Sequence, residues 1–313
     1  MKLVFCGTPR FAVPTLDALL RSGHEIALVV TQPDRPVGRS QEMAAPAAKQ
    51  SALTAGLAVT QPEKIRNNEE FHARLEAIAP EAIVVVAYGR IIPPWMLELP
   101  RLGCINLHAS LLPKYRGAAP IQWAVAMGET VTGNTTMLLE QGLDTGPILL
   151  RQEMVIGPDE TAVELLDVLA ERGAQLMVET LKGLAGGSVT PKPQDDARAT
   201  LAPLLSREDG RMDFAVRTAE ELRNRWRGFQ PWPGAFTTLD GKKLLVHRMK
   251  VAKSDHDALA EPGEVRVADG KILVACAQGT WLELVELQLE GRKHLQAAEF
   301  LRGIQLKTGA RLG

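Results

Sequence analysis

The chain has 313 residues, of which 45% are hydrophobic, and a net charge of −1. This length suits about two domains of ~150 residues each, and the near-neutral charge lacks the strong basic excess by which nucleic-acid binders are usually recognised. No apolar run approaches the ~18 residues of a membrane span, and the N-terminal apolar run reaches Gly7-Thr8-Pro9 too soon for a secretory signal, so we expect a cytoplasmic protein.

The first part of the chain alternates strand and helix patterns, which is typical of a parallel α/β sheet. We expect strands at 2–6, 25–30, 57–59 and 82–87, and helices at 9–22, 46–55 and 68–78, with a long Pro-rich loop after the second strand. The run Ile83-Val84-Val85-Val86 is continuously apolar. It therefore predicts a central strand that is buried on both faces.

The next expected strand, 103–107, leads into the polar motif Asn106-Leu107-His108. Alternate residues of a strand face the same way, so Asn106 and His108 can converge on one small group. A loop with Pro113 and Gly117 then leads to an expected helix at 118–127. Ligand sites in open α/β sheets lie beyond the carboxyl ends of the strands, and this motif is therefore the first candidate site.

The remaining patterns divide the chain in two. Strands at 132–140 and 148–155 and a helix at 161–184 complete a first domain, and a stretch rich in Gly and Pro follows. A capping box, Thr218-Ala219-Glu220-Glu221, then opens a short Arg-rich helix. Five short strands are expected at 235–239, 243–251, 263–267, 271–275 and 280–289. We expect them to close into a small β-barrel, which leaves no strand edge unpaired. We expect domains at 1–188 and 206–313, joined by a linker at 189–205.

Several familiar motifs are missing. Pro9 and Arg10 stand where a dinucleotide fold would place glycines, which disfavours a nicotinamide enzyme. There is no Walker A lysine, and the histidines show no metal-ligand spacing, so we expect no metal. Cys6, Cys104 and Cys276 are isolated in apolar runs and are expected to be buried thiols.

Longer motifs resemble the folate-dependent formyltransferase family. They are Asn106-Leu107-His108-Ala109-Ser110-Leu111-Leu112-Pro113, Arg116-Gly117 and Gly142-Leu143-Asp144-Thr145-Gly146. Three others are similar to the branch that formylates an aminoacyl-tRNA: Phe5-Cys6-Gly7-Thr8-Pro9, Thr31-Gln32-Pro33-Asp34-Arg35-Pro36-Val37-Gly38-Arg39 and Pro231-Trp232-Pro233-Gly234-Ala235-Phe236. The resemblance runs nearly end to end, and motifs of this length are specific.

The resemblance implies a Rossmann-like catalytic domain that uses 10-formyltetrahydrofolate as co-substrate, and an OB-like C-terminal β-barrel that helps to hold initiator methionyl-tRNA. It also implies Asn106, His108 and Asp144 as the catalytic residues. Our hypothesis is that Asn106 and His108 stabilise the formyl oxyanion. Asp144 would assist protonation of His108 and relay protons from the amine to the folate.

The resemblance further implies a folate site lined largely by main-chain groups. Its expected residues are Tyr88, Gly89, Ser110, Leu111, Leu112 and Pro113. Main-chain groups can recognise a planar heterocycle, so the side chains are weaker candidates. The side chain of Tyr88 is equally compatible with packing in the core and with lining the pocket.

The resemblance assigns Arg35 and Arg39 to tRNA binding, through phosphate or base-edge contacts. The chain departs from the family pattern after Arg39, where Ser40-Gln41-Glu42-Met43 replaces the usual lysines. Arg223 and Arg227 share a helix face and, with cations of the second domain, either form a basic stripe or are scattered solvated charges.

Two other functions remain open. The same formyl-folate chemistry could serve a nucleotide-sugar amine or water, which the 31–39 run and the lack of an additional catalytic domain disfavour. The second possible function is a folate- or RNA-binding module without catalytic turnover. The presence of Asn106, His108 and Asp144 together counts against it.

Overall fold

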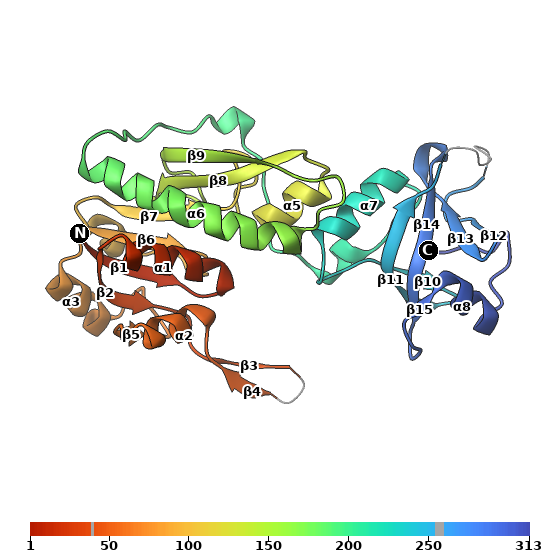
Figure 1. Ribbon diagram of the computed structural model, residues 1–313, viewed down its shortest axis with the longest axis horizontal. Coiled ribbons are helices and arrows are strands. Elements are labelled where there is room, and N and C mark those ends of the chain that lie inside the picture. The colour runs from red at the N-terminus through yellow and green to blue at the C-terminus, as the bar shows by residue number, and fades with distance from the viewer. Residues whose placement is uncertain (39–40, 254–259) are drawn as a thin grey trace. The chain divides into compact units, whose positions relative to one another are not determined.

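A seven-stranded sheet organises the first part of the protein in the computed structural model, which describes residues 1–38, 41–253 and 260–313 (Figure 1). The strand order is β5-β2-β1-β6-β7-β8-β9. The strands are β1 (Lys2–Gly7), β2 (Glu25–Val30), β5 (Val59–Thr60), β6 (Ala82–Val86), β7 (Cys104–His108), β8 (Val131–Leu138) and β9 (Ile148–Val155). The pairs from β5 to β7 are parallel, while β8 and β9 are antiparallel additions at one edge.

Strand β6 lies in the middle of the sheet, as its apolar run predicts. Ile83, Val84 and Val86 are completely buried, because helices cover both faces of a parallel sheet and leave no solvent-facing side. The prediction of a central buried strand is therefore confirmed.

Five helices accompany this sheet. They are α1 (Val13–Arg21), preceded by the 3-10 helix η1 (Arg10–Ala12), α2 (Ala47–Thr54), α3 (Glu69–Ile78), α4 (Pro94–Glu98) and α6 (Ala162–Ala185). The side chain of Asn68 caps α3 by accepting a hydrogen bond from the Phe71 N–H at 3.0 Å. The sequence analysis did not predict α4, because five residues are too few to show a helical period.

Helix α6 supports the strand that carries the candidate site. A Cβ at Gly173 of α6 would lie 2.7 Å from the side chain of Leu107 on β7, so the helix backbone packs directly on that strand. Leu107 points to α6, and its neighbours Asn106 and His108 therefore face the opposite side of the sheet.

The Pro-rich loop after β2 contains a hairpin that the sequence analysis did not predict. Strand β3 (Arg35–Val37) pairs antiparallel with β4 (Glu42–Ala44), and Figure 1 shows the hairpin projecting from the sheet. Its base is held at Asp34, whose carboxylate accepts from the Lys49 ammonium at 2.7 and 2.9 Å and from the Gln61 amide at 2.8 Å. These contacts lower the pKa of Asp34.

The last part of the chain forms a six-stranded antiparallel sheet. Its path is β10-β11-β14-β13-β12, and β15 pairs with β14. The strands are β10 (Phe236–Leu239), β11 (Lys242–Val251), β12 (Val265–Ala268), β13 (Lys271–Ala275), β14 (Trp281–Leu289) and β15 (Leu295–Gln296). The expected class, a mostly parallel α/β domain followed by a β domain, is confirmed.

Helices α7 (Ala219–Gly228) and α8 (Ala297–Gly303) pack on the core of the second sheet. The predicted capping box of α7 is confirmed, because the Thr218 hydroxyl accepts from the Glu221 N–H at 3.3 Å and the Glu221 carboxylate accepts from the Thr218 N–H at 2.8 Å. The sequence analysis did not predict α8.

The chain divides into two compact units. The first comprises Met1–Pro120, Val131–Val155 and Glu164–Pro203, and the second comprises Ile121–Thr130, Ile156–Val163 and Leu204–Gly313, so that most of α5 (Pro120–Ala126) belongs to the second. Most of the expected linker, 189–205, thus lies within the first unit. None of the described helices is long and apolar enough to cross a membrane.

Candidate active site

The end of β7 places Asn106 and His108 on one face, 8% and 6% exposed respectively. A buried carboxamide is normally hydrogen-bonded, yet none of the described residues hydrogen-bonds the side chain of Asn106. Its donors and acceptor are therefore available to a ligand.

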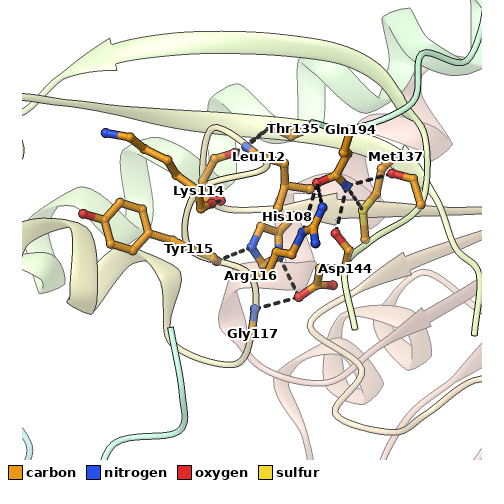
Figure 2. Close-up of polar contacts among 12 residues, drawn as sticks. His108, Leu112, Lys114, Tyr115, Arg116, Gly117, Thr135, Met137, Asp144 and Gln194 are labelled. Atoms are coloured by element: carbon orange, nitrogen blue, oxygen red, sulfur yellow. Dashed lines mark hydrogen bonds and ion pairs between the residues drawn. The ribbon is translucent and has the colours of Figure 1, made fainter. Parts of the chain in front are cut away.

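His108 is held by the loop that follows β7. Its Nε2 lies 2.9 Å from the Tyr115 carbonyl oxygen (Figure 2). A carbonyl only accepts, so Nε2 carries a proton and donates to it. The other ring nitrogen, Nδ1, faces the Asp144 carboxylate at 3.7 Å, and it is the nitrogen that remains for chemistry.

Asp144 lies in the loop between β8 and β9, opposite His108. One carboxylate oxygen, Oδ2, accepts from the Gly117 N–H at 2.8 Å and is also the oxygen nearest His108 Nδ1. The backbone φ of Asp144 is +52°, a left-handed conformation that is uncommon for a residue other than glycine. The structure thus brings together His108 and Asp144, which are 36 residues apart, on the strand end that carries Asn106.

Two residues that the sequence analysis did not assign to the site adjoin this pair. The Gln194 amide nitrogen donates to the carbonyls of Asp144 and Gly146 at 2.8 and 2.7 Å. The Gln194 amide oxygen accepts from the Arg116 guanidinium at 2.8 and 3.1 Å. Arg116 lay in a recognised motif, whereas Gln194 lies in the expected linker and carried no local signal.

The loop at 110–113 is folded onto β8, and several expected folate contacts point inward. The Ser110 hydroxyl donates to the Lys114 carbonyl at 2.6 Å, and the Leu112 N–H donates to the Thr135 hydroxyl at 3.1 Å. Leu112 packs in a small apolar cluster, and Pro113 is buried while Leu111 is half-buried. The side chains of Ser110 and Leu112 therefore shape the loop.

The side chain of Tyr88 lies in the core and not in an open pocket. It is 2% exposed, packs with the core cluster around β6, and burial raises its pKa. Its carbonyl oxygen accepts from the Thr8 hydroxyl at 3.0 Å and from the Gln32 amide at 3.2 Å. Of the two structural alternatives for Tyr88, packing is confirmed. Gly89 follows at φ +79°. Of Tyr88 and Gly89, only main-chain groups are therefore placed to contact a ligand.

A cavity of about 330 Å³ opens beside this turn. It is lined by Lys64, Ile65, Arg66, Asn67, Arg90 and Ile91. Arg90 is held by the Gln32 side-chain oxygen at 3.0 Å, and Ile91 is 89% exposed. The surface of this cavity is mostly apolar, and three of its six lining residues, Lys64, Arg66 and Arg90, are cationic. The sequence analysis missed it because its two segments are far apart along the chain.

The whole chain is similar to known formyltransferases. The family described as formyl transferase matches residues 1–181, and the formyl transferase C-terminal domain matches residues 204–305. The chain is 67% identical over 313 residues to the methionyl-tRNA formyltransferase of Acidobacterium capsulatum, with 100% of both chains covered. It is 56% identical to that of Koribacter versatilis, with 100% of this chain and 99% of the relative covered.

The chain belongs to the methionyl-tRNA formyltransferase family.

Solved structures of other formyltransferases share its fold. A sugar 3N-formyl transferase, WlaRD, matches with a TM-score of 0.66 at 16% identity, covering 94% of this chain and 99% of that one. An N-formyltransferase from Helicobacter canadensis matches with a TM-score of 0.66 at 16% identity, covering 91% and 98%. At such identity these structures speak for the fold alone, and the expected Rossmann-like formyltransferase fold is confirmed.

The arginines that the sequence analysis considered for tRNA binding differ in exposure and in their hydrogen-bond partners. Arg35 is exposed at the start of β3, whereas Arg39 lies outside the described residues. In the second unit, Arg227 is 4% exposed and donates to the Gly157 and Glu160 carbonyls at 3.2 and 2.8 Å. Arg223 pairs with Asp159. Arg223 and Arg227 therefore bind the segment at 157–160, so that, of the two alternatives, ion-paired charges describe these two residues better than a basic stripe.

We found no group of three His, Cys, Asp or Glu residues within 1–38, 41–253 and 260–313 that could hold a metal ion.

Gly146→Ala is expected to destabilise this family member. A Cβ at Gly146 would lie 1.8 Å from the Leu138 carbonyl oxygen, so the loop that carries Asp144 would have to move. We expect a loss of about 1–3 kcal/mol, as for other overpacked sites, measured as a lower Tm. Gly303→Ala is the control, because a Cβ there meets nothing within 4 Å. Equal Tm values for the two variants would contradict this expectation.

Proposed function

We propose that the protein transfers the formyl group of 10-formyltetrahydrofolate to the amino group of methionine on initiator methionyl-tRNA, giving formylmethionyl-tRNA for translation initiation. The observation that carries this proposal is the pair of groups at the end of β7: a buried carboxamide without a partner, and an imidazole whose Nδ1 faces a carboxylate at 3.7 Å. The full-length similarity to methionyl-tRNA formyltransferases supports the choice of substrates.

The mechanism follows from the orientation of these groups. The methionyl amine attacks the formyl carbon with its lone pair, and the carbonyl pair moves to the formyl oxygen. The Asn106 amide and the Nδ1–H of a doubly protonated His108, whose charge the Asp144 carboxylate stabilises, donate to that oxyanion, where preorganised donors contribute most. Asp144 accepts the proton that the amine loses. When the carbonyl re-forms and the bond to N10 breaks, that proton passes to N10, directly or through a water.

The folate is proposed to lie along the turn at Tyr88 and Gly89 and the loop at 110–113. Main-chain groups there suit the pterin, because the side chains of Tyr88, Ser110 and Leu112 are turned inward. The cavity beside this turn suits the glutamate end, whose carboxylates can pair with Lys64, Arg66 and Arg90 in its lining.

One assay distinguishes the possible acceptors. The purified protein is given labelled formyl-folate with charged methionyl-tRNA, with a nucleotide-linked amino sugar, or with neither, and the labelled product is identified. We expect formylmethionyl-tRNA alone. Formylation of the sugar, or release of formate at a comparable rate without an acceptor, would mean that the acceptor is an amino sugar or water and not methionyl-tRNA. Binding of folate or RNA without any product would mean a binding module.

Arg35→Gln is expected to raise KM for methionyl-tRNA about tenfold, as for the loss of one charge-assisted hydrogen bond of ~1.5 kcal/mol. KM for the folate should not change. If Arg35 contacts a phosphate, the slope of log KM against log salt should also fall by about 1. The control is Arg74→Gln, an exposed arginine on α3. Equal KM values for the two variants would remove Arg35 from the tRNA site.

A further inference from the structure

Gln194 contacts the loop of Asp144 with both hydrogens of its side-chain amide. The amide nitrogen donates to the Asp144 carbonyl at 2.8 Å and to the Gly146 carbonyl at 2.7 Å. These two carbonyls belong to the residues on either side of Thr145. One side chain thus holds the main chain at Asp144 and at Gly146, and Figure 2 shows Gln194 beside Asp144.

Arg116 binds Gln194 and is followed in the chain by Gly117, which holds the carboxylate of Asp144. It is 7% exposed, and its guanidinium donates to the Gln194 amide oxygen from two nitrogens, at 2.8 and 3.1 Å. The next residue, Gly117, donates its N–H to Asp144 Oδ2 at 2.8 Å. The carboxylate is therefore held by Gly117 while its main chain is held by Gln194, and Arg116 joins these two restraints.

The same segment of chain also holds His108. The Thr200 hydroxyl accepts from the Tyr115 N–H at 2.9 Å, and the Thr200 carbonyl accepts from the Arg116 N–H at 2.8 Å. The Tyr115 carbonyl is the acceptor for His108 Nε2. Gln194 and Thr200 therefore restrain the two members of the His108–Asp144 pair, Gln194 through the loop of Asp144 and Thr200 through Tyr115.

We propose that Gln194 is a positioning residue that sets the Asp144 carboxylate against His108 Nδ1. This inference rests on the proposed function, because it assigns a task to Gln194 through the catalytic role of Asp144. At 3.7 Å the two groups are just beyond hydrogen-bond distance, so a small movement of the loop decides whether they engage. Asp144 adopts φ +52°, which a non-glycine residue keeps only when its surroundings restrain it.

The test is Gln194→Met, which has a similar volume but lacks the amide. We expect kcat for formyl transfer to fall about 100-fold, the size of effect that a displacement of ~1 Å at a reacting group can have. KM for both substrates should stay close to the wild-type values. Asp195→Asn is the matched control in the same segment, because an asparagine side-chain oxygen can still accept from the Ala197 N–H, and it should not change kcat.

Gln194→Glu isolates the two bonds to the loop. It keeps an acceptor for Arg116 but replaces both donors with an oxygen that faces two carbonyls. We expect the same fall in kcat, and this variant serves as the test if Gln194→Met does not fold. A kcat close to that of wild type for a folded variant of either kind would overturn the proposal.

A double-mutant cycle separates positioning from a general structural role. If Gln194 acts through Asp144, then Gln194→Met should lower kcat by less than about threefold when Asp144→Asn is already present. A full additional 100-fold loss in that background would overturn the proposal. Absence of formyl transfer by the wild-type protein, or an unimpaired Asp144→Asn variant, would instead show that the proposed function or catalytic role is wrong, and the inference would fail with it.

Discussion

His108→Ala is expected to lower kcat/KM for formylation of methionyl-tRNA by about 10²–10³-fold, the typical loss of one oxyanion donor. The substitution removes Nδ1, which faces the Asp144 carboxylate at 3.7 Å. It also removes Nε2, whose hydrogen bond to the Tyr115 carbonyl restrains the loop after β7. The measurement is steady-state kinetics with each substrate varied in turn.

His108→Gln separates these two contributions. A glutamine side chain carries an amide N–H that can take the place of Nε2 and donate to the Tyr115 carbonyl, but it has no group at the position of Nδ1. We therefore expect a Tm closer to wild type than that of His108→Ala, with activity equally low. Activity within tenfold of wild type in either variant would contradict the assignment of His108 to the oxyanion.

Local patterns in the sequence were enough to predict much of this protein. The apolar run at 83–86 predicts the central strand because complete burial leaves no place for a polar residue. The spacing of Asn106 and His108 predicts their common face because a strand has a period of two. Both features depend only on residues close together in the chain.

Contacts between distant segments were not predictable in this way. Gln194 reaches the Asp144 loop from 50 residues away, and a Gly- and Pro-rich stretch around it has the composition of a flexible linker. Strand β3 of the β3–β4 hairpin contains Pro36. Proline lacks a backbone N–H donor and is uncommon in strands, so the sequence does not indicate a strand there. The position of Gln194 depends on side-chain hydrogen bonds to a distant loop, and the hairpin depends on backbone pairing between its two strands. Local composition does not reveal either kind of contact.

Asn106→Asp is expected to lower kcat/KM by at least as much as His108→Ala, about 10²–10³-fold. The substitution keeps the shape of the side chain but replaces the amide donors with a carboxyl group, which when ionised would repel the negative charge that develops on the formyl oxygen. Because no described residue hydrogen-bonds the Asn106 carboxamide, the substitution breaks no hydrogen bond within the protein, and the fall in Tm should come only from burying the ionised carboxyl and become smaller as the pH falls. Thermal unfolding and kinetics on the same preparation test both parts.

The pH dependence of Asn106→Asp gives a further check. Burial raises the pKa of a carboxyl group because it disfavours the charged form, and position 106 is 8% exposed. At lower pH the introduced carboxyl becomes protonated, loses its charge and can donate a hydrogen bond again. The activity of the variant relative to wild type should therefore rise as the pH falls, whereas Asn106→Leu, which cannot donate at any pH, should show a constant ratio. A ratio for Asn106→Asp that does not change with pH, or that falls toward acid, would mean that Asn106 does not act as a donor to the developing oxyanion.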